Sequence, residues 1–245
     1  MTESNSITGS ARPLLSVVAP CRDEADNLRQ FLEEITTALA TVGEYEILVV
    51  DDGSTDGSLE LLKALKGDYP RLRVLALDGG YGQTAALGAG FKAARGEIIA
   101  MIDADLQDDP ADIPRMMERL REVDAVNGWR AVRQDNLLRL LSGRIANRIR
   151  NWATDETIVD SASGLKVFRR ECLVGLKLFK GLHRFLPTLL RMEGFRVAEI
   201  PVNHRPRLRG RSKYGLWNRM FKAFHDLLAV RWMKARQLRY TAREV

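Results

Sequence analysis

The chain has little cysteine and no long apolar run. Its 245 residues include only two cysteines, too few for a disulfide framework and in keeping with a reducing compartment. No stretch of about 18 or more apolar residues occurs, so we expect no membrane-spanning helix. Residues 1–12 are polar and lack the basic start and apolar segment of a signal peptide, so we expect a disordered tail there.

Several motifs of common enzyme classes are also missing. No Gly-x-Gly-x-x-Gly follows the first predicted strand, and no Gly-x-x-x-x-Gly-Lys-Ser/Thr is present, which argues against a Rossmann dehydrogenase and a P-loop NTPase. The three histidines are scattered without zinc-binding spacing. Ser163-Gly164 lacks the flanking glycine that the nucleophile elbow of a hydrolase requires.

The chain does contain enough hydrophobic residues for a core, and its charge is unevenly distributed. Hydrophobic residues make up 45% and charged residues 29%, enough for one large α/β domain with a substantial core. Residues 205–245 contain 12 Lys or Arg against two Asp or Glu, although the whole chain carries a net charge of only +6. A basic end on a slightly acidic body indicates a polyanionic neighbour, which is anionic lipid, phosphate or nucleic acid.

Short apolar runs alternate with helical patterns along the first half of the chain. The predicted strands are residues 14–20, 44–52, 71–77, the apolar start of 97–107, and 124–129. The predicted helices are residues 27–42, a segment carrying Leu59, Leu62 and Leu65, residues 83–95, and a segment starting at Pro110. This alternation predicts an α/β fold with a mostly parallel central sheet flanked by helices.

The second half of the chain is less regular. It is predicted to contain a basic helical stretch (133–154), a strand (163–170), a helix (181–192), a strand (195–203), an Arg-, Gly-, Ser- and Lys-rich loop (205–215) and a helix (216–239). We therefore expect a tail at residues 1–12, one domain at 13–215, and a basic amphipathic helical segment at 216–245.

Three of the predicted strands end in acidic residues. The segments are Cys21-Arg-Asp-Glu24, Asp51-Asp52 and Asp103-Ala-Asp105. In an open α/β sheet the carboxyl ends of the strands border the ligand crevice, so we expect these acids along one edge. The alternative is a set of solvated loops and helix caps, which fits Asp26 and Asp56 best.

The acidic segment after the fourth strand has the composition of a metal site. The carboxylates of Asp103 and Asp105 and the amide oxygen of Gln107 are hard ligands suited to Mg²⁺ or Mn²⁺. An ion of this kind takes few protein ligands and completes its coordination with substrate phosphates. The segment therefore predicts a site for a metal and a diphosphate.

The sequence resembles the family 2 glycosyltransferases of the GT-A fold, and among them the dolichol- and polyprenyl-phosphate sugar transferases. The stretches that carry the resemblance are Val17-Val-Ala-Pro-Cys-Arg-Asp-Glu24, Val49-Val-Asp-Asp-Gly-Ser-Thr-Asp56, Gly82-Gln-Thr-Ala-Ala-Leu87, Asp103-Ala-Asp-Leu-Gln-Asp-Asp-Pro110, Asn127-Gly-Trp-Arg130, Asp160-x-x-Ser-Gly164, His183-Arg-Phe-Leu186 and Arg207-x-x-Gly-x-Ser-Lys-Tyr-Gly215. Their order and spacing over roughly residues 14–215 make the resemblance specific.

The resemblance implies roles for individual residues. Asp103, Asp105 and Gln107 would bind Mg²⁺ or Mn²⁺. The residues expected to hold the nucleotide-sugar donor are Pro20, Glu24, Asp52, Gln83, Asp103, Ala104 and Ser212. The first three of them would lie at the base and ribose.

The residues expected to act in the transfer are Asp105, Arg130, Arg207 and Lys213. Arg130 would lie near the sugar or a phosphate, and the Arg207–Lys213 loop would bind phosphate.

The implied reaction needs no general base from the protein. The acceptor, a polyprenyl or dolichyl phosphate, is already an anionic nucleophile, so the enzyme has to align it and stabilise the departing diphosphate. A single in-line displacement inverts the configuration of the sugar. The resemblance favours GDP-mannose as donor. However, Cys21-Arg22-Asp23-Glu24 stands where the family often has an aromatic followed by Asn-Glu, which leaves base stacking and a UDP-sugar donor open.

Other activities and partners remain as alternatives. The chain could transfer sugar to a saccharide or protein hydroxyl, or bind a nucleotide sugar without catalysis. A nucleic-acid partner is not expected, because the aromatics of the basic tail follow helical spacing. The helix at 216–239 could pack on its own domain, form a homodimer, or lie on the cytoplasmic face of a membrane. We expect the last, with the protein a peripheral enzyme.

Overall fold

The computed structural model describes residues 13–131, 147–152, 156–161, 163–206, 216–238 and 243–244. Its strands are β1 (Leu15–Cys21), β2 (Tyr45–Asp51), β3 (Leu72–Ala76), β4 (Ile98–Met101), β5 (Ala125–Arg130), β6 (Lys166–Arg169) and β7 (Val197–Val202). Its α-helices are α1 (Ala25–Ala38), α2 (Ser58–Leu65), α3 (Gln83–Ala93), α4 (Ile113–Arg119), α6 (Leu186–Met192) and α7 (Leu216–Ala235). Short 3₁₀ turns are η1 (Pro110–Asp112), η2 (Arg170–Leu173) and η3 (Leu182–Arg184).

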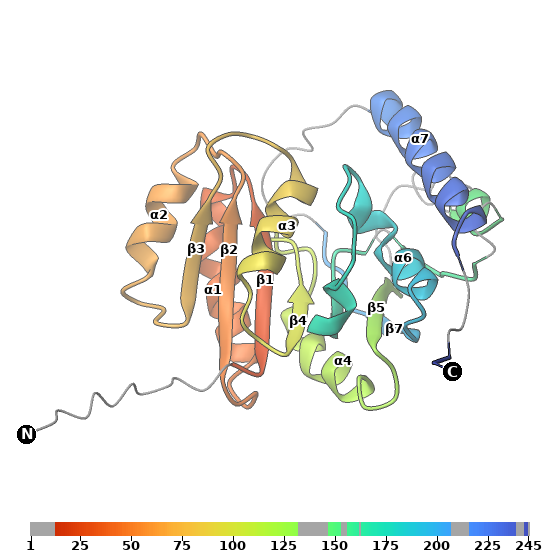
Figure 1. The fold of residues 1–245 in the computed structure, drawn as a ribbon. Helices are drawn as coiled ribbons and strands as arrows, with labels where there is room; N and C mark the ends of the chain where they lie inside the picture. The colour runs from red at the N-terminus through yellow and green to blue at the C-terminus, as the bar shows by residue number, and fades with distance from the viewer. Residues whose placement is uncertain are drawn as a thin grey trace, which may run out of the picture.

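The seven strands form one sheet in the order β3-β2-β1-β4-β6-β5-β7 (Figure 1). β1 pairs in parallel with β2 and β4, β2 with β3, and β5 with β7, whereas β6 runs antiparallel to β4 and β5. The expected α/β fold with a mostly parallel sheet is thereby confirmed. The carboxyl ends of β1, β2 and β4 lie next to one another at one edge, as the acidic strand ends predict.

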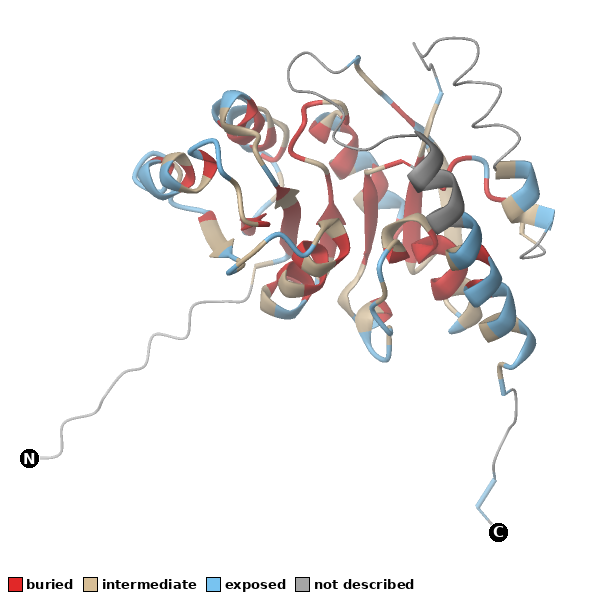
Figure 2. Cartoon of the chain, turned by 90° about the horizontal axis from the view of Figure 1, so that it is seen from above, coloured by how far each residue is buried: buried red, intermediate tan, exposed pale blue. Residues whose placement is uncertain are grey.

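Helices cover both faces of the sheet, and each face has its own apolar core. Leu28 and Ile35 of α1 belong to one core, together with side chains of α2 and α4. Leu87 and Phe91 of α3 belong to the other, together with side chains of α6 and α7. Figure 2 shows buried strands between helices that expose their outer sides. Removing these apolar faces from water is the main favourable term in folding.

Helix α7 packs on the domain through one side only. Leu227 and Val230 are buried in the second core, whereas Phe224, Leu228 and Trp232 are exposed. The short helical segment 147–152 lies beside it, since the guanidinium carbon of Arg231 is 5.3 Å from the centre of the Trp152 ring. Within the described part of the chain, no helix is long and apolar enough to cross a membrane.

Some local predictions need correction. Helix α1 begins at Ala25, so Asp26 lies in the first turn and is not the cap. Asp56 does satisfy helix N-termini, because its carboxylate accepts hydrogen bonds from the backbone N–H groups of Ala25 and Ser58. The predicted helix at 181–192 is divided into η3 and α6. Most of the helix predicted at 133–154 lies outside the described residues.

Candidate active site

The carboxyl edge of the sheet gathers acidic residues from separate segments. Asp52 follows β2, and Asp103 and Asp105 follow β4. A sharp turn separates Asp105 from Gln107. It contains Leu106, whose φ of 62° is uncommon for a residue with a side chain. The Asp105 carboxylate accepts a hydrogen bond from the backbone N–H of Gln107 at 3.2 Å, which helps to hold that turn.

Asp103 is the most perturbed acid of the edge. Its Oδ1 accepts a hydrogen bond of 2.7 Å from Nε2 of Gln83 at the start of α3. Burial, and then the charges of Asp105 and Asp108, raise the pKa of Asp103 to about 7, against the opposing effects of Lys166 and the Gln83 hydrogen bond. The positive charge of Lys166 is therefore outweighed by burial and by the two neighbouring carboxylates.

Asp108 and Gly164 complete the surroundings of Asp103. A Cβ atom on Gly164 would lie 2.9 Å from Oδ2 of Asp103 and closer still to Oδ2 of Asp108. The absence of a side chain at Gly164 therefore lets two carboxylates from the β4 loop approach the backbone that precedes β6. This explains why Gly164 stands in one of the motifs.

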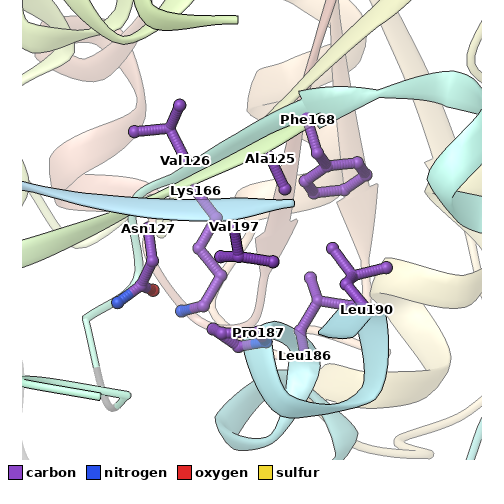
Figure 3. A pocket seen from close by; sticks show the side chains of 9 residues that line it. All are labelled: Ala125, Val126, Asn127, Lys166, Phe168, Leu186, Pro187, Leu190 and Val197. Carbon is purple, nitrogen blue, oxygen red and sulfur yellow. The ribbon is translucent and has the colours of Figure 1, made fainter. Parts of the chain in front are cut away.

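Lys166 is a buried cation beneath this acidic cluster. Its ammonium group donates to the backbone oxygen of Ser163, and burial lowers its pKa to about 8, although Asp108, Asp160 and Asp103 each oppose this effect. Figure 3 shows the Lys166 side chain and Asn127 at a pocket closed by Leu186 and Pro187 of α6.

That pocket is not a substrate site. Its volume is about 10 Å³, enough for roughly one water molecule and far too small for a sugar. Its lining is mostly apolar, and the buried side-chain oxygen of Asn127 has no hydrogen-bond partner.

Arg130, which was expected to approach the sugar or a phosphate, is held by an acidic partner. Its Nε and Nη2 donate to the two carboxylate oxygens of Asp160 at 2.6 and 3.0 Å, and its backbone N–H also points to Asp160 at 3.4 Å. Both side chains are largely buried, with 13% and 11% exposure. A two-point pair of this kind fixes the guanidinium in one orientation.

The segment before the Arg207–Lys213 loop is attached to the acidic turn. Asp108 and His204 form an isolated antiparallel bridge, and the backbone N–H of Arg205 donates to the oxygen of Gln107 at 2.8 Å. The Arg205 guanidinium also pairs with Glu34 of α1 at 2.7 Å and with Asp109 at 3.1 Å. Arg207, Ser212 and Lys213 themselves lie outside the described residues.

Residues expected at the nucleotide base take part in loop structure. Asp52 accepts hydrogen bonds from the backbone N–H groups of Tyr81 and Gly82, at 2.7 Å and 2.9 Å. Glu24 accepts one from Asn27 at 2.6 Å. Asp52 therefore fixes the 78–82 loop against the end of β2, where Pro20 of β1 pairs with Val50.

The charges and donor atoms of the cluster fit a divalent cation. Four negative charges are present when the carboxylates of Asp103, Asp105, Asp108 and Asp160 are ionised. Lys166 and Arg130 carry two positive charges, so the cluster has a net charge of −2. No group of three or more His, Cys, Asp or Glu side chains among the described residues forms a metal cage. Two carboxylates and an amide are nevertheless the kind of incomplete set that Mg²⁺ completes with phosphates.

The sequence did not single out Asp108, Asp160, Lys166 or Arg205. Lys166 offered one signal, a charged residue directly before the apolar pair Val167-Phe168 of a predicted strand. Asp108 and Asp160 stood in the matched motifs without an assigned role, and Arg205 was counted only as part of a basic loop. Of the predicted residues, Gln83 and Asp103 are brought into direct contact, and Ala104 is buried beside them.

The described geometry agrees with a family assignment. Residues 16–175 match Glycosyl transferase family 2. The chain is 37% identical over 236 residues to the dodecaprenyl-phosphate galacturonate synthase of Rhizobium johnstonii, across 94% of this chain and 68% of that protein. The chain belongs to glycosyl transferase family 2 and is a glycosyltransferase.

A second relative gives the same assignment. The undecaprenyl-phosphate 4-deoxy-4-formamido-L-arabinose transferase of Klebsiella pneumoniae is 36% identical over 217 residues, across 87% of this chain and 66% of that protein. The chain thus spans about two thirds of the length of these relatives. Both relatives are named for the attachment of a sugar to a polyprenyl phosphate, and neither is named for mannose.

Solved structures show the shared GT-A fold. A mannosyltransferase from Pyrobaculum calidifontis, in complex with GDP-mannose and Mn²⁺, has a TM-score of 0.67 at 21% identity, across 95% of this chain and 67% of that one. Glucosyl-3-phosphoglycerate synthase from Mycobacterium tuberculosis, with Mg²⁺ and UDP, has a TM-score of 0.67 at 20% identity, across 91% and 79%.

Proposed function

We propose that this glycosyltransferase moves a sugar from a nucleoside-diphosphate sugar to a polyprenyl phosphate. The observation that carries the proposal is the similarity over 94% of the chain to a dodecaprenyl-phosphate galacturonate synthase. The relatives do not support mannose, so we propose a UDP-sugar as donor in place of GDP-mannose. The acidic edge supplies a site of matching chemistry, because a diphosphate is recognised through a divalent cation bound to carboxylates.

Asp103, Asp105 and Gln107 would hold Mg²⁺ or Mn²⁺ in this proposal. The cation supplies a Lewis acid for the leaving diphosphate. Gln83 orients the Asp103 carboxylate through its 2.7 Å hydrogen bond. Lys166 lowers the repulsion around Asp103, and Arg130 pairs with Asp160.

The protein's task in the transfer is alignment. A non-bridging oxygen of the lipid phosphate forms a bond to the anomeric carbon as the bond from that carbon to the donor diphosphate breaks, which inverts the configuration. The nucleophile needs no proton removed. Arg130 is fixed by Asp160 in one orientation, and this pair would border the space in which the sugar and phosphates are aligned. Arg207, Ser212 and Lys213 are proposed to bind phosphate from the neighbouring loop.

The acceptor implies contact with a membrane. Phe224, Leu228 and Trp232 form an exposed stripe on α7, and Trp152 lies beside this helix. Exposed aromatics on a basic amphipathic helix are typical of helices that lie in the headgroup region. We therefore propose that α7 rests on the surface of a membrane that contains the acceptor.

A transfer assay tests the proposal. Purified protein is incubated with Mn²⁺, a short polyprenyl phosphate and radiolabelled UDP- and GDP-sugars, and counts in the organic phase are measured with and without EDTA. We expect metal-dependent transfer from a UDP-sugar, and a loss of about 100-fold in Asp105→Asn. Asp68→Asn, at a carboxylate that is 64% exposed, is the control. Transfer from GDP-mannose alone would contradict the proposed UDP-sugar donor. Transfer only to a soluble saccharide would contradict the proposed polyprenyl-phosphate acceptor.

A further inference from the structure

Two successive residues after β7 pair with the acidic turn. Nδ1 of His204 lies 3.4 Å from Oδ1 of Asp108, and the backbone N–H of Arg205 donates to the backbone oxygen of Gln107 at 2.8 Å. In return, Nε2 of Gln107 donates to the backbone oxygen of Arg205 at 3.4 Å. Gln107 uses its amide nitrogen in this contact, and its amide oxygen is the atom that would bind a hard cation.

The Arg205 side chain joins the turn to a helix. Its Nη2 is 3.1 Å from Oδ2 of Asp109 in the turn, and its Nη1 is 2.7 Å from Oε2 of Glu34 in α1. Asp109 is itself fixed, since its other oxygen accepts the backbone N–H of Ala111 at 3.1 Å. The two arms of one guanidinium therefore reach two carboxylates, which a single ammonium group does less well.

The turn needs support of this kind. Three of the five residues from 105 to 109 are aspartates, whose charges repel one another, and Leu106 has a φ of 62°, which is unfavourable for a residue with a side chain. Glu34 is a firm point of attachment, because its neighbour Ile35 is fully buried in the core. Arg205 thus ties a turn of unfavourable charge and conformation to a rigid helix.

We propose that Arg205 is a positioning residue for the metal site, which holds the 105–109 turn through Asp109 and Glu34 and so prepares Gln107 as a ligand. This inference rests on the proposed function, since that function assigns Gln107 to a cation. It predicts an effect of unexpected sign. A positive charge near the site repels a cation, so loss of the charge alone would tighten metal binding, whereas loss of positioning weakens it.

Titration of the full chain with Mn²⁺, followed through the electron paramagnetic resonance signal of the free ion, tests the sign. We expect Arg205→Gln to weaken Mn²⁺ binding about tenfold, as is typical when a partner outside the ligand set is lost. Arg115→Gln is the matched control. Arg115 also pairs with an aspartate near the turn, Asp112 at 2.7 Å, and donates to the backbone oxygen of Pro201. Its Mn²⁺ affinity should stay within about twofold of wild type.

Glu34→Gln provides a second variant, which leaves the acidic turn and Arg205 unaltered. We expect it to weaken Mn²⁺ binding about threefold, since the Asp109 contact of Arg205 remains. Combining it with Arg205→Gln should cause no further loss, because Glu34 acts through Arg205. For the same reason, Arg205→Gln should cost no additional affinity in protein that already carries Gln107→Ala. Melting curves by circular dichroism establish that each variant is folded.

The possible results separate this inference from the proposed function. Unchanged or tighter Mn²⁺ binding in folded Arg205→Gln, or wild-type binding in Glu34→Gln, would overturn the positioning role and leave the glycosyltransferase proposal intact. An equal loss in Arg115→Gln, or a further loss in the Gln107→Ala protein, would overturn it too, because the effect would not pass through Gln107. If wild-type protein bound no Mn²⁺ with or without UDP, the proposed metal site and this inference would fail together.

Discussion

At the scale of single residues, Asp103 is a proposed metal ligand in a place of unfavourable charge. Its carboxyl group shares a confined space with Asp105 and Asp108, and burial together with these charges raises its pKa to about 7. A metal ligand must be deprotonated, so a proton on Asp103 competes with a cation. Metal binding should therefore be coupled to proton release near neutral pH.

The coupling gives a measurable prediction. Because the pKa of Asp103 is raised to about 7, the group is mostly protonated at pH 6 and mostly ionised at pH 8. Mn²⁺ binding should release close to one proton at pH 6 and far less at pH 8, and the affinity should be about tenfold weaker at pH 6. Calorimetry in buffers of different ionisation enthalpy measures the release. Asp103→Asn should lose this difference, and equal proton release at both pH values would contradict the prediction.

Sequence reasoning found part of this cluster and missed the rest for a physical reason. Asp103 and Asp105 are neighbours in the chain, so their spacing alone indicated a shared ligand. Asp108 lies in the same loop, but Asp160 and Lys166 come from a distant segment, and the pairing of β6 with β4 brings Lys166 to this edge. A residue's pKa depends on such neighbours in space, which no local pattern records.

At the scale of elements, Glu46 joins several strands at the end of the sheet opposite the site. Its carboxylate accepts hydrogen bonds of 2.6 Å from Ser16 of β1, Arg73 of β3 and the backbone N–H of Arg95. Burial raises the pKa of Glu46, but these hydrogen bonds outweigh that effect and leave the pKa below its usual value. The ionised form is therefore the one that stabilises the fold.

The sign of the pH dependence follows from the lowered pKa. The contribution of Glu46 is fully present above the pKa of an unfolded glutamate, about 4.3, and is lost as the pH falls through the lower folded value. Glu46→Gln should reduce the free energy of unfolding at pH 7 by about 1–3 kcal/mol. Urea unfolding from pH 7 to 3.5 measures this effect. The difference in the free energy of unfolding between Glu46→Gln and wild type should shrink as the pH falls below the pKa of an unfolded glutamate. Glu44→Gln, whose side chain is 71% exposed, is the control, and an equal effect there would refute the assignment.

Element prediction succeeded where one periodicity extends over a whole segment. The strands β1, β2 and β4 were recognisable because buried parallel strands are continuously apolar. The stretch at 181–192 carried helical spacing, but Gly181 adopts a φ of 93° and a new helix begins at Leu186 with Pro187 in its first turn. The orientation of β6 could not be predicted, since strand direction is set by the tertiary path of the chain.

At the scale of the whole molecule, the two sides of α7 have different roles. Leu227 and Val230 belong to the second core, so deleting residues 216–245 would remove core side chains together with any membrane contact. Point substitutions on the outer side separate the two effects.

The membrane contact predicts a specific loss. The combined variant Phe224→Ser, Leu228→Ser and Trp232→Ser should lower co-sedimentation with anionic phosphatidylglycerol vesicles at least about tenfold, because it removes apolar surface that would enter the headgroup region. The melting temperature should stay within a few degrees, since these side chains are exposed. Val174→Ser, at an exposed valine directly after η2, is the control. Vesicle binding equal to that of wild type would refute a role for this stripe.

The direction of β6 has a consequence for how this enzyme could change over evolutionary time. β5 ends, and the antiparallel β6 begins, at the same edge of the sheet as the acidic cluster, so both ends of the 131–165 connection open beside the site. A change in the length of this connection would leave the register of every strand as it is, but it would have to keep in place Asp160 and Gly164, which lie against Arg130 and the acidic turn. Variation in the rest of the connection could therefore alter what binds beside the site while the strands that carry the acidic edge are inherited unchanged.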